Sequence, residues 1–250
     1  RSRYRRPPAD RRARERLGGS APLVPRTDRS AAPPRYALLV GAYSNDRPYR
    51  GKRLVDLLLL AVVALPALAI GAVCAAAVGL TSPGGVFFTQ ERVGMGGQPF
   101  KVYKFRSMVA GDNPIFPDAS RITTVGKVLR RLSLDELPQL INVALGDMSV
   151  VGPRPTLAYQ VERYDAHQRR RLAVRPGLTG LAQVNGRNAL SWDDRIDFDV
   201  TYVETQSAAE DLRIVMKTFS TLLTGEGVEG HPTDDPLAAP ASTADTDGED

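Results

Sequence analysis

Two adjacent acidic residues, Asp135 and Glu136, are the first candidates for chemistry in this sequence. Ser133 and Glu136 match a capping box, which places both acids in the first turn of a predicted helix. One interpretation is structural, because acids in that turn stabilise the helix dipole. The other is chemical, because a carboxylate at a helix N-terminus can hold Mg²⁺ beside a diphosphate or attack phosphorus. Two arginines just upstream, Arg130 and Arg131, favour the chemical interpretation.

A second candidate is Arg154, which lies between two prolines in Gly152-Pro-Arg-Pro155. The prolines fix the backbone, so the guanidinium is presented for bidentate contact with phosphate at a reduced entropy cost. The equal alternative is an ordinary ion pair with a carboxylate such as Asp147. A third candidate, Arg187, ends a stretch rich in glycine and side-chain amides over residues 174–188. Such a stretch can approach a ligand closely, although taken alone it is better explained as a turn-rich connector.

Lys104 and Arg106 form a fourth candidate, because alternate residues of a strand share one face. That face could contact phosphates or lipid headgroups, while a solvated strand face is the commoner explanation. The single cysteine, Cys74, excludes a disulfide scaffold and a cysteine-built metal site. With only two histidines, His167 and His231, a multi-histidine centre is not expected, and the sequence contains no P-loop or nucleophile elbow.

An uncharged apolar segment, Leu57–Leu80, precedes the candidate residues and predicts attachment of the chain to a membrane. As one helix it would cover ~36 Å, enough to cross a bilayer core of ~30 Å. Pro66 lies near its middle and removes a backbone hydrogen bond, which predicts a bend. Basic residues flank the segment on both sides, which is typical of cytoplasmic flanks. We therefore expect a segment that enters the membrane and returns.

The remaining elements predict an α+β fold, a small and mainly helical domain with a short β-hairpin. Strands are expected at Val86–Gln90 and Phe100–Phe105, joined by the glycine-rich turn 94–97. Helices are expected at four places: Val125–Arg131, Leu134–Leu145, Thr156–Val174 and Ser207–Thr224.

The net charge of +5 hides two oppositely charged tails. Residues 1–50 contain 13 arginines and 4 acids, and residues 225–250 contain 8 acids and no Lys or Arg. Both compositions are typical of disorder. We predict a tail at 1–50, a membrane helix-break-helix at 51–82, a catalytic domain at 83–225 and an acidic tail at 226–250. No nucleic-acid partner is expected for the first tail.

Taken together and in order, these stretches resemble the bacterial sugar transferase family, the monotopic phosphoglycosyl transferases. The resemblance covers roughly Lys52 to Gly230. The motifs that carry it are Lys52-Arg-Leu-Val-Asp56, Tyr103-Lys-Phe-Arg-Ser-Met108, Ser133-Leu-Asp-Glu136, Gly146-Asp-Met-Ser149, Gly152-Pro-Arg-Pro155, and Arg175-Pro-Gly177 through Gln183-Val-Asn-Gly-Arg-Asn188. One departure is Leu65-Pro66, where family members often have Ser-Pro.

The resemblance implies transfer of a sugar 1-phosphate from a UDP-sugar to undecaprenyl phosphate, with release of UMP. Asp135 would be the nucleophile of a covalent intermediate and a Mg²⁺ ligand, and Glu136 its partner in the dyad. Arg130, Arg154 and Arg187 would contact phosphate or nucleotide. The family also implies a re-entrant membrane helix over residues 54–80 at the cytoplasmic face of the bacterial inner membrane. Membrane lipid is then a further partner, and a homodimer stays open.

The rival hypothesis is a membrane-anchored adaptor without enzymatic activity, whose arginine-rich tail binds nucleic acid or anionic lipid. It leaves the arginine and glycine loops unexplained. A scaffold that merely retains an enzyme-like sequence is a third hypothesis, against which the intact Asp135-Glu136 pair argues.

Overall fold

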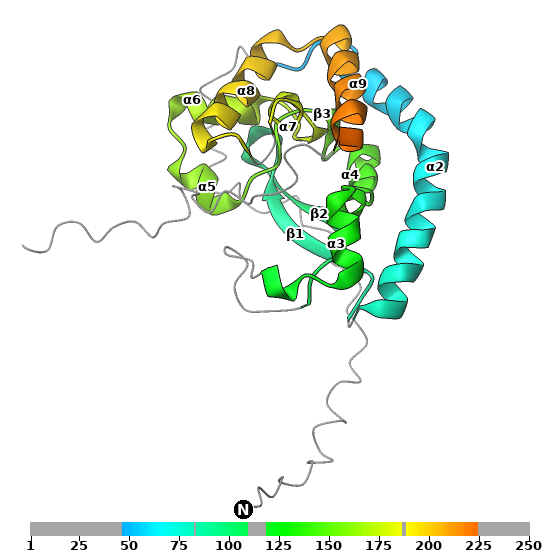
Figure 1. The fold of residues 1–250 in the computed structure, drawn as a ribbon. Helices are drawn as coiled ribbons and strands as arrows, with labels where there is room; N and C mark the ends of the chain where they lie inside the picture. The colour runs from blue at the N-terminus through cyan, green and yellow to red at the C-terminus, as the bar shows by residue number, and fades with distance from the viewer. Residues whose placement is uncertain (1–46, 83, 110–118, 187–188, 225–250) are drawn as a thin grey trace, which may run out of the picture. The chain divides into compact units, whose positions relative to one another are not determined.

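The computed structural model describes residues 47–224, apart from residues 83, 110–118 and 187–188 (Figure 1). The predicted tails therefore lie almost wholly outside the described residues, as does Arg187. The described chain is mainly helical with two small sheets, which confirms the predicted α+β class.

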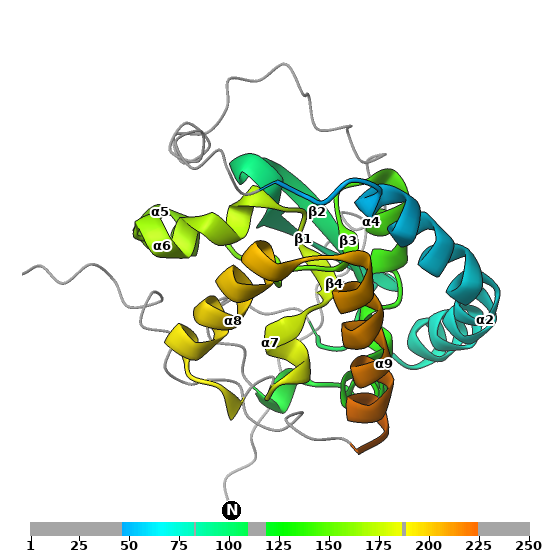
Figure 2. The same ribbon diagram turned by 90° about the horizontal axis from the view of Figure 1, so that it is seen from above.

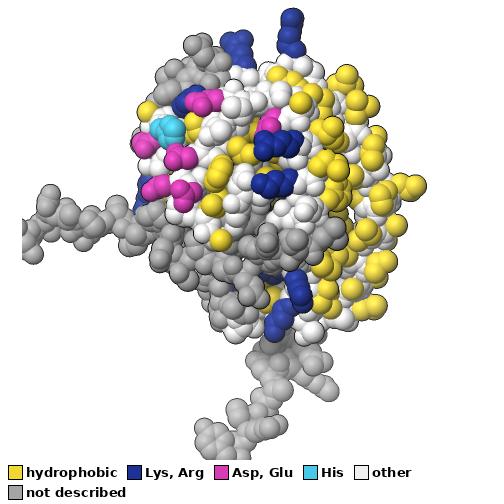
Figure 3. Space-filling model, turned by 45° about the horizontal axis from the view of Figure 1, so that its top comes forward, with side chains coloured by type: hydrophobic (Ala, Val, Ile, Leu, Met, Phe, Trp, Pro, Cys, Tyr) yellow, Lys and Arg dark blue, Asp and Glu magenta, His cyan; other side chains and the backbone are white. Residues whose placement is uncertain are grey.

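The apolar segment forms one long helix, α2 (Lys52–Thr81), of 30 residues. The predicted break into two helices is not seen, because helical hydrogen bonding continues past Pro66. The proline lies inside one helix, whose axis curves along its length (Figures 1 and 2). The helix is long and apolar enough to cross a membrane, and only 6% of its most apolar window is buried. Large apolar side chains such as Val62, Leu65 and Leu68 are exposed along its middle. Figure 3 shows hydrophobic side chains gathered on the side of the molecule where α2 lies.

The predicted hairpin is present. Strand β1 (Phe87–Val93) pairs antiparallel with β2 (Pro99–Phe105), with Phe87 opposite Phe105. The connecting turn needs glycine, because Gly96 and Gly97 have φ angles of 67° and 76°. Inner residues of β2, Phe100 and Val102, pack on Val143 and Met148.

A second sheet was not predicted. Strand β3 (Ser149–Val151) pairs parallel with β4 (Gly177–Thr179), and each has only three residues, too few to show an alternating pattern. The pairing brings two backbones unusually close at glycine. A Cβ on Gly177 would lie 2.1 Å from the backbone nitrogen of Gly152.

Around the candidate acids, the predicted long helix Leu134–Leu145 is divided into two pieces. A 3₁₀ turn, η4 (Leu134–Glu136), precedes α4 (Gln139–Leu145), which ends at Gly146 with φ 90°. The predicted capping box is wrong, because Ser133 has φ 55° and its side chain makes no capping bond. Pro138 lies between the two pieces and has no N–H to continue the first. Upstream, α3 (Thr124–Arg131) confirms its prediction, with Thr123 as its N-cap.

The predicted helix Thr156–Val174 is also wrong as a single element. It consists of α5 (Ala158–Arg163), α6 (Ala166–Arg169) and a 3₁₀ turn, η5 (Arg170–Ala173). The break occurs because Asp165 starts a new helix by accepting a bond from the N–H of Gln168.

Three helices complete the fold: α7 (Leu181–Val184), the unpredicted α8 (Trp192–Thr205) and α9 (Ala208–Thr224). The last confirms its prediction, and the Ser207 hydroxyl accepts the N–H of Glu210 at its start. Figure 2 shows these helices grouped beside β3 and β4, where Val151, Tyr202 and Ile214 form a shared core.

A buried polar network ties the first turn of α2 to this core. The Lys52 Nζ atom lies 2.7 Å from Asp211 Oδ2 and 3.2 Å from Asp56 Oδ1. Asp56 Oδ1 also accepts bonds from Ser149 Oγ (2.8 Å) and the Val150 N–H (3.1 Å) of β3. At the other end of α2, Cys74 and Val78 pack on Phe105 and Leu129. Both ends of the helix are therefore fixed to the same domain.

Replacing Gly177 with alanine should destabilise the domain, because a methyl group there overlaps the Gly152 backbone. We expect a loss of about 1–3 kcal/mol in the free energy of unfolding. Thermal unfolding of the detergent-purified protein would measure it. The matched control is Gly85→Ala, where the nearest atoms would lie at 3.9 and 4.0 Å. Equal melting temperatures for the two variants would contradict the close approach of β3 and β4.

Candidate active site

The turn that carries Asp135 and Glu136 is anchored by its apolar neighbours. Leu134 and Leu137 pack against the cluster that holds Phe105 and Leu129. The two acids thus lie beside β2, and both are largely withdrawn from solvent. Since the capping box is absent, helix capping does not explain this acidic pair.

Glu136 is fully engaged by two basic side chains. Its Oε1 atom lies 2.7 Å from Lys104 Nζ and 2.8 Å from Arg154 Nη2, and Oε2 lies 3.5 Å from Arg154 Nη1. Burial alone would raise the pKa of Glu136, but the charges of Arg154 and Lys104 outweigh it and hold the pKa well below its usual range. Glu136 is therefore ionised and its charge is neutralised inside the protein.

Asp135 is in a different electrostatic environment. It is 8% exposed, and none of the described residues donates a hydrogen bond to its carboxylate. Burial raises its pKa, the charge of Lys104 opposes the rise, and the neighbouring Glu136 adds to it. Arg130 and Arg154 also favour the ionised form. The result is a carboxylate with positive charge around it and oxygen atoms free to form a bond.

Arg154 contacts Glu136 from the loop of residues 153–156, called here the Arg154 loop. Each of its four backbone carbonyls accepts a hydrogen bond. The carbonyl of Pro153 accepts the Gly177 N–H at 2.8 Å, and that of Thr156 accepts the Val93 N–H at 2.9 Å. Between them, the Arg154 carbonyl accepts a bond from Arg171 at 3.0 Å, and the Pro155 carbonyl accepts one from Arg92 at 3.4 Å. The expected alternative, an ion pair between Arg154 and a carboxylate, is therefore present, although the partner is Glu136 and not Asp147.

The other predicted residues divide into two groups. Lys104 joins the site, and Arg130 lies close enough to act on the charge of Asp135 while its Nη1 atom contacts the sulfur of Met108 at 3.6 Å. Arg106 does not join it, because β2 ends at Phe105 and the Arg106 Nε–H instead bonds the Gly85 carbonyl at 2.7 Å.

The sequence did not reveal a buried ion pair behind the Arg154 loop, Arg171 with Asp199. Arg171 is the last of three successive arginines, yet it is 5% exposed, and Asp199 is 2% exposed. A signal for Asp199 was available. It lies on the apolar face of α8 with Ile196, Val200 and Val203, at the spacing of a buried stripe.

The carboxylates fit one kind of metal site. Among the described residues no group of three or more His, Cys, Asp or Glu side chains could enclose an ion. Mg²⁺, however, is commonly held by one or two carboxylates together with substrate phosphates. Asp135 fits that arrangement because its oxygen atoms are free, whereas Glu136 is already engaged by Lys104 and Arg154.

Known proteins are similar in sequence to this chain over most of its described length. The model of the family described as "Bacterial sugar transferase" matches residues 48–225. The uncharacterized sugar transferase EpsL of Bacillus subtilis (strain 168) is 47% identical over 147 residues, covering 58% of this chain and 73% of EpsL.

Two further relatives match over longer stretches. The exopolysaccharide production protein ExoY of Rhizobium meliloti (strain 1021) is 40% identical over 203 residues, which cover 72% of this chain and 90% of ExoY. A UDP-glucose:undecaprenyl-phosphate glucose-1-phosphate transferase of Caulobacter vibrioides is 41% identical over 186 residues, covering 69% of this chain and 70% of that protein. The match to the family model spans well over half of the sequence, and the chain belongs to the bacterial sugar transferase family.

Proposed function

We propose that this protein transfers a sugar 1-phosphate from a UDP-sugar to undecaprenyl phosphate and releases UMP. The observation that carries the proposal is the unbonded, buried carboxylate of Asp135, surrounded by the positive charge of Lys104, Arg130 and Arg154. The name of the Caulobacter relative, a glucose-1-phosphate transferase acting on undecaprenyl phosphate, supports the same reaction.

In the first half-reaction, a carboxylate oxygen of Asp135 attacks the phosphorus that bears the sugar. A bond forms between that oxygen and phosphorus, the bridging P–O bond of the diphosphate breaks, and UMP leaves with the electron pair. A carboxylate needs no general base for this attack, because it is ionised at neutral pH. Arg154 and Lys104 serve a second purpose, since their charges oppose the charge of the phosphates that approach the acids.

In the second half-reaction, a phosphate oxygen of undecaprenyl phosphate attacks the same phosphorus and frees the Asp135 carboxylate. A covalent intermediate lets the soluble and lipid substrates use one site in turn. When bound, Mg²⁺ would neutralise charge on the donor diphosphate and stabilise the leaving UMP. Asp135 is the residue proposed to hold it.

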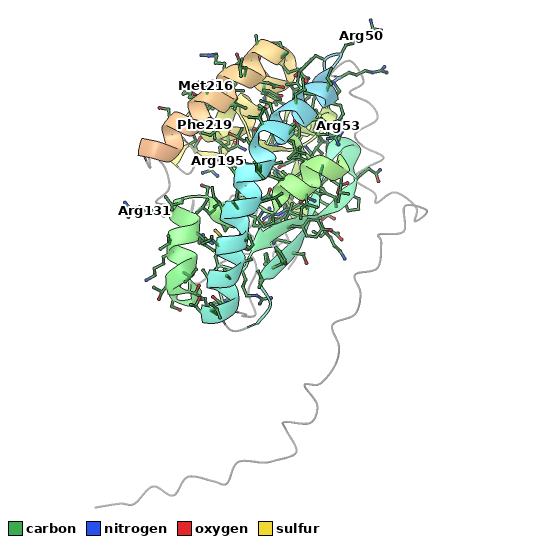
Figure 4. All side chains as sticks on the ribbon, turned by 90° about the vertical axis from the view of Figure 1, so that its right-hand side faces the viewer. Arg50, Arg53, Arg131, Arg195, Met216 and Phe219 are labelled. Carbon is green, nitrogen blue, oxygen red and sulfur yellow. The ribbon has the colours of Figure 1, made fainter. Side chains whose placement is uncertain are left out.

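The proposed place of action is the cytoplasmic face of the bacterial cell membrane. The apolar side chains along the middle of α2 are exposed, which suits lipid, while both ends of α2 pack on the same domain. A straight span would put its two ends on opposite sides of the membrane, so a helix that enters and returns explains this packing better. In Figure 4, which looks onto α2, Met216 and Phe219 of α9 lie beside it and extend the exposed apolar surface.

The activity is tested by incubating the purified protein with Mg²⁺, undecaprenyl phosphate and a panel of UDP-sugars, and by measuring UMP. We expect one or a few UDP-sugars to release UMP, and EDTA to abolish the release until Mg²⁺ is restored. Asp135→Asn should lose activity by at least about a thousandfold, because the nucleophile is gone. The matched control is Glu162→Gln on the exposed surface of α5. Full activity in Asp135→Asn would exclude Asp135 as the nucleophile.

Lys104 and Arg106 should differ sharply in effect, although the sequence presents them as a pair. Lys104→Gln removes a cation that lies 2.7 Å from Glu136 and lowers the pKa of Asp135, so we expect about a hundredfold loss of UMP release. Arg106→Gln should leave the rate within about twofold, because Arg106 bonds backbone carbonyls near Gly85. Steady-state rates of both variants test this, and equal losses would place Arg106 in the site.

The topology can be tested with single cysteines at Arg50 and Thr81, introduced in a Cys74→Ala background. Both positions are exposed and flank the apolar part of α2. In intact cells, a membrane-impermeant maleimide should label neither cysteine, and after permeabilisation it should label both. Labelling of only one position in intact cells would mean that α2 crosses the membrane.

A further inference from the structure

The buried arginine behind the Arg154 loop makes three polar contacts at once. Arg171 Nη1 donates to the Tyr164 hydroxyl at 2.7 Å, and Nη2 bonds both the Asp199 carboxylate and the Arg154 carbonyl, the latter at 3.0 Å. Its guanidinium also lies 5.7 Å from the centre of the Tyr164 ring. Arg171, Tyr164 and Asp199 are all nearly inaccessible to solvent.

A buried guanidinium is costly unless a counterion compensates it, and Asp199 provides that charge. Burial raises the pKa of Asp199 to about 6 despite the opposing charge of Arg171, so the carboxylate is still ionised at neutral pH. The planar fork of arginine can serve three acceptors in fixed directions, which the single ammonium group of lysine cannot do in the same geometry.

The contact with the Arg154 carbonyl links the Arg171–Asp199 pair to the candidate active site. The side chain of Arg154 is 53% exposed, so solvent alone would leave it mobile, yet it makes a two-pronged contact with Glu136. Its backbone, by contrast, is hydrogen-bonded to buried side chains through the Arg154 carbonyl. Rigid hydrogen bonds run from Asp199 on α8, through Arg171 on η5, to the backbone of Arg154.

We propose that Arg171 is a positioning residue for phosphate transfer, which fixes the Arg154 backbone so that the Arg154 guanidinium meets Glu136 and the donor phosphates. Asp199 and Tyr164 hold Arg171 in the orientation that this requires. The inference rests on the proposed function of Arg154, and it assigns Arg171 no contact with substrate.

The test is a double-mutant cycle. Arg171→Lys keeps the charge but loses the fork, and kcat/KM for the UDP-sugar should fall about tenfold to a hundredfold. In an Arg154→Gln background the same change should have almost no further effect, because the group that it positions is gone. The matched control is Arg170→Lys, one residue away, where the side chain pairs with Glu204 at the surface and activity should be unchanged. If the effects of Arg171→Lys and Arg154→Gln multiply, Arg171 does not act through Arg154 and the proposal is overturned.

A second measurement does not depend on activity. Hydrogen exchange of the peptide covering residues 151–157 should become faster in Arg171→Lys and stay unchanged in Arg170→Lys, while exchange in β1 and β2 is the same in both. Uniformly faster exchange would indicate a general loss of stability and would overturn the positioning role, as would an unchanged loop. If the wild-type protein releases no UMP, the proposed function fails, and the exchange result still decides whether Arg171 orders the loop.

If Arg171→Lys does not fold, Tyr164→Phe is the second variant. It removes one acceptor and leaves the Asp199 pair in place. We expect a smaller loss of kcat/KM that again disappears in the Arg154→Gln background, and a loss that persists there would count against the proposal.

Discussion

The site depends on how the charge of one buried carboxylate, that of Glu136, is compensated. A carboxylate withdrawn from water must be paired, and Glu136 is paired by side chains from two other parts of the chain, Lys104 of β2 and Arg154 of the following loop. These contacts bring together the β1–β2 hairpin, the 3₁₀ turn η4 and the Arg154 loop. They also separate the properties of two neighbouring acids, because Glu136 is neutralised within the protein while Asp135 keeps unbonded oxygen atoms. Two adjacent acids thus have different surroundings: Glu136 is held by two cations, and Asp135 keeps oxygen atoms available for the nucleophilic role proposed above.

The sequence predicted elements wherever a pattern is long enough to be read. The hairpin, α3, α9 and the long apolar helix follow from alternation, helical spacing or an uncharged run. The pairing of β3 with β4 could not be predicted. Three residues are too few to show an alternating pattern, and the paired residues Ser149 and Gly177 are 28 positions apart in the sequence. Helical spacing also predicted two helices that are too long. One is interrupted at Pro138, and the other is interrupted where Asp165 caps a new helix.

Candidate site residues were predictable by type but not by partner. Lys104 and Arg106 have the same sequence signal, and only the end of β2 at Phe105 decides that one reaches Glu136 and the other does not. Likewise, Arg170 and Arg171 are adjacent in the sequence, yet Arg170 pairs with Glu204 at the surface and Arg171 pairs with Asp199 in the interior. Such outcomes depend on contacts between residues distant in sequence, which no local pattern specifies.

The long apolar helix α2 is connected by hydrogen bonds to the strand that precedes the Arg154 loop. Asp56, one turn after Lys52, accepts bonds from Ser149 and Val150 of β3, and Arg154 lies three residues after β3 ends at Val151. The path from the exposed apolar helix to the proposed phosphate-binding arginine therefore consists of these hydrogen bonds and a short loop whose carbonyls are hydrogen-bonded. Because α2 is held at both ends, its depth in a membrane would set the orientation of the whole domain. For the proposed reaction, which takes one substrate from water and the other from a bilayer, such a fixed relation would hold the Asp135 carboxylate at one distance from the membrane surface.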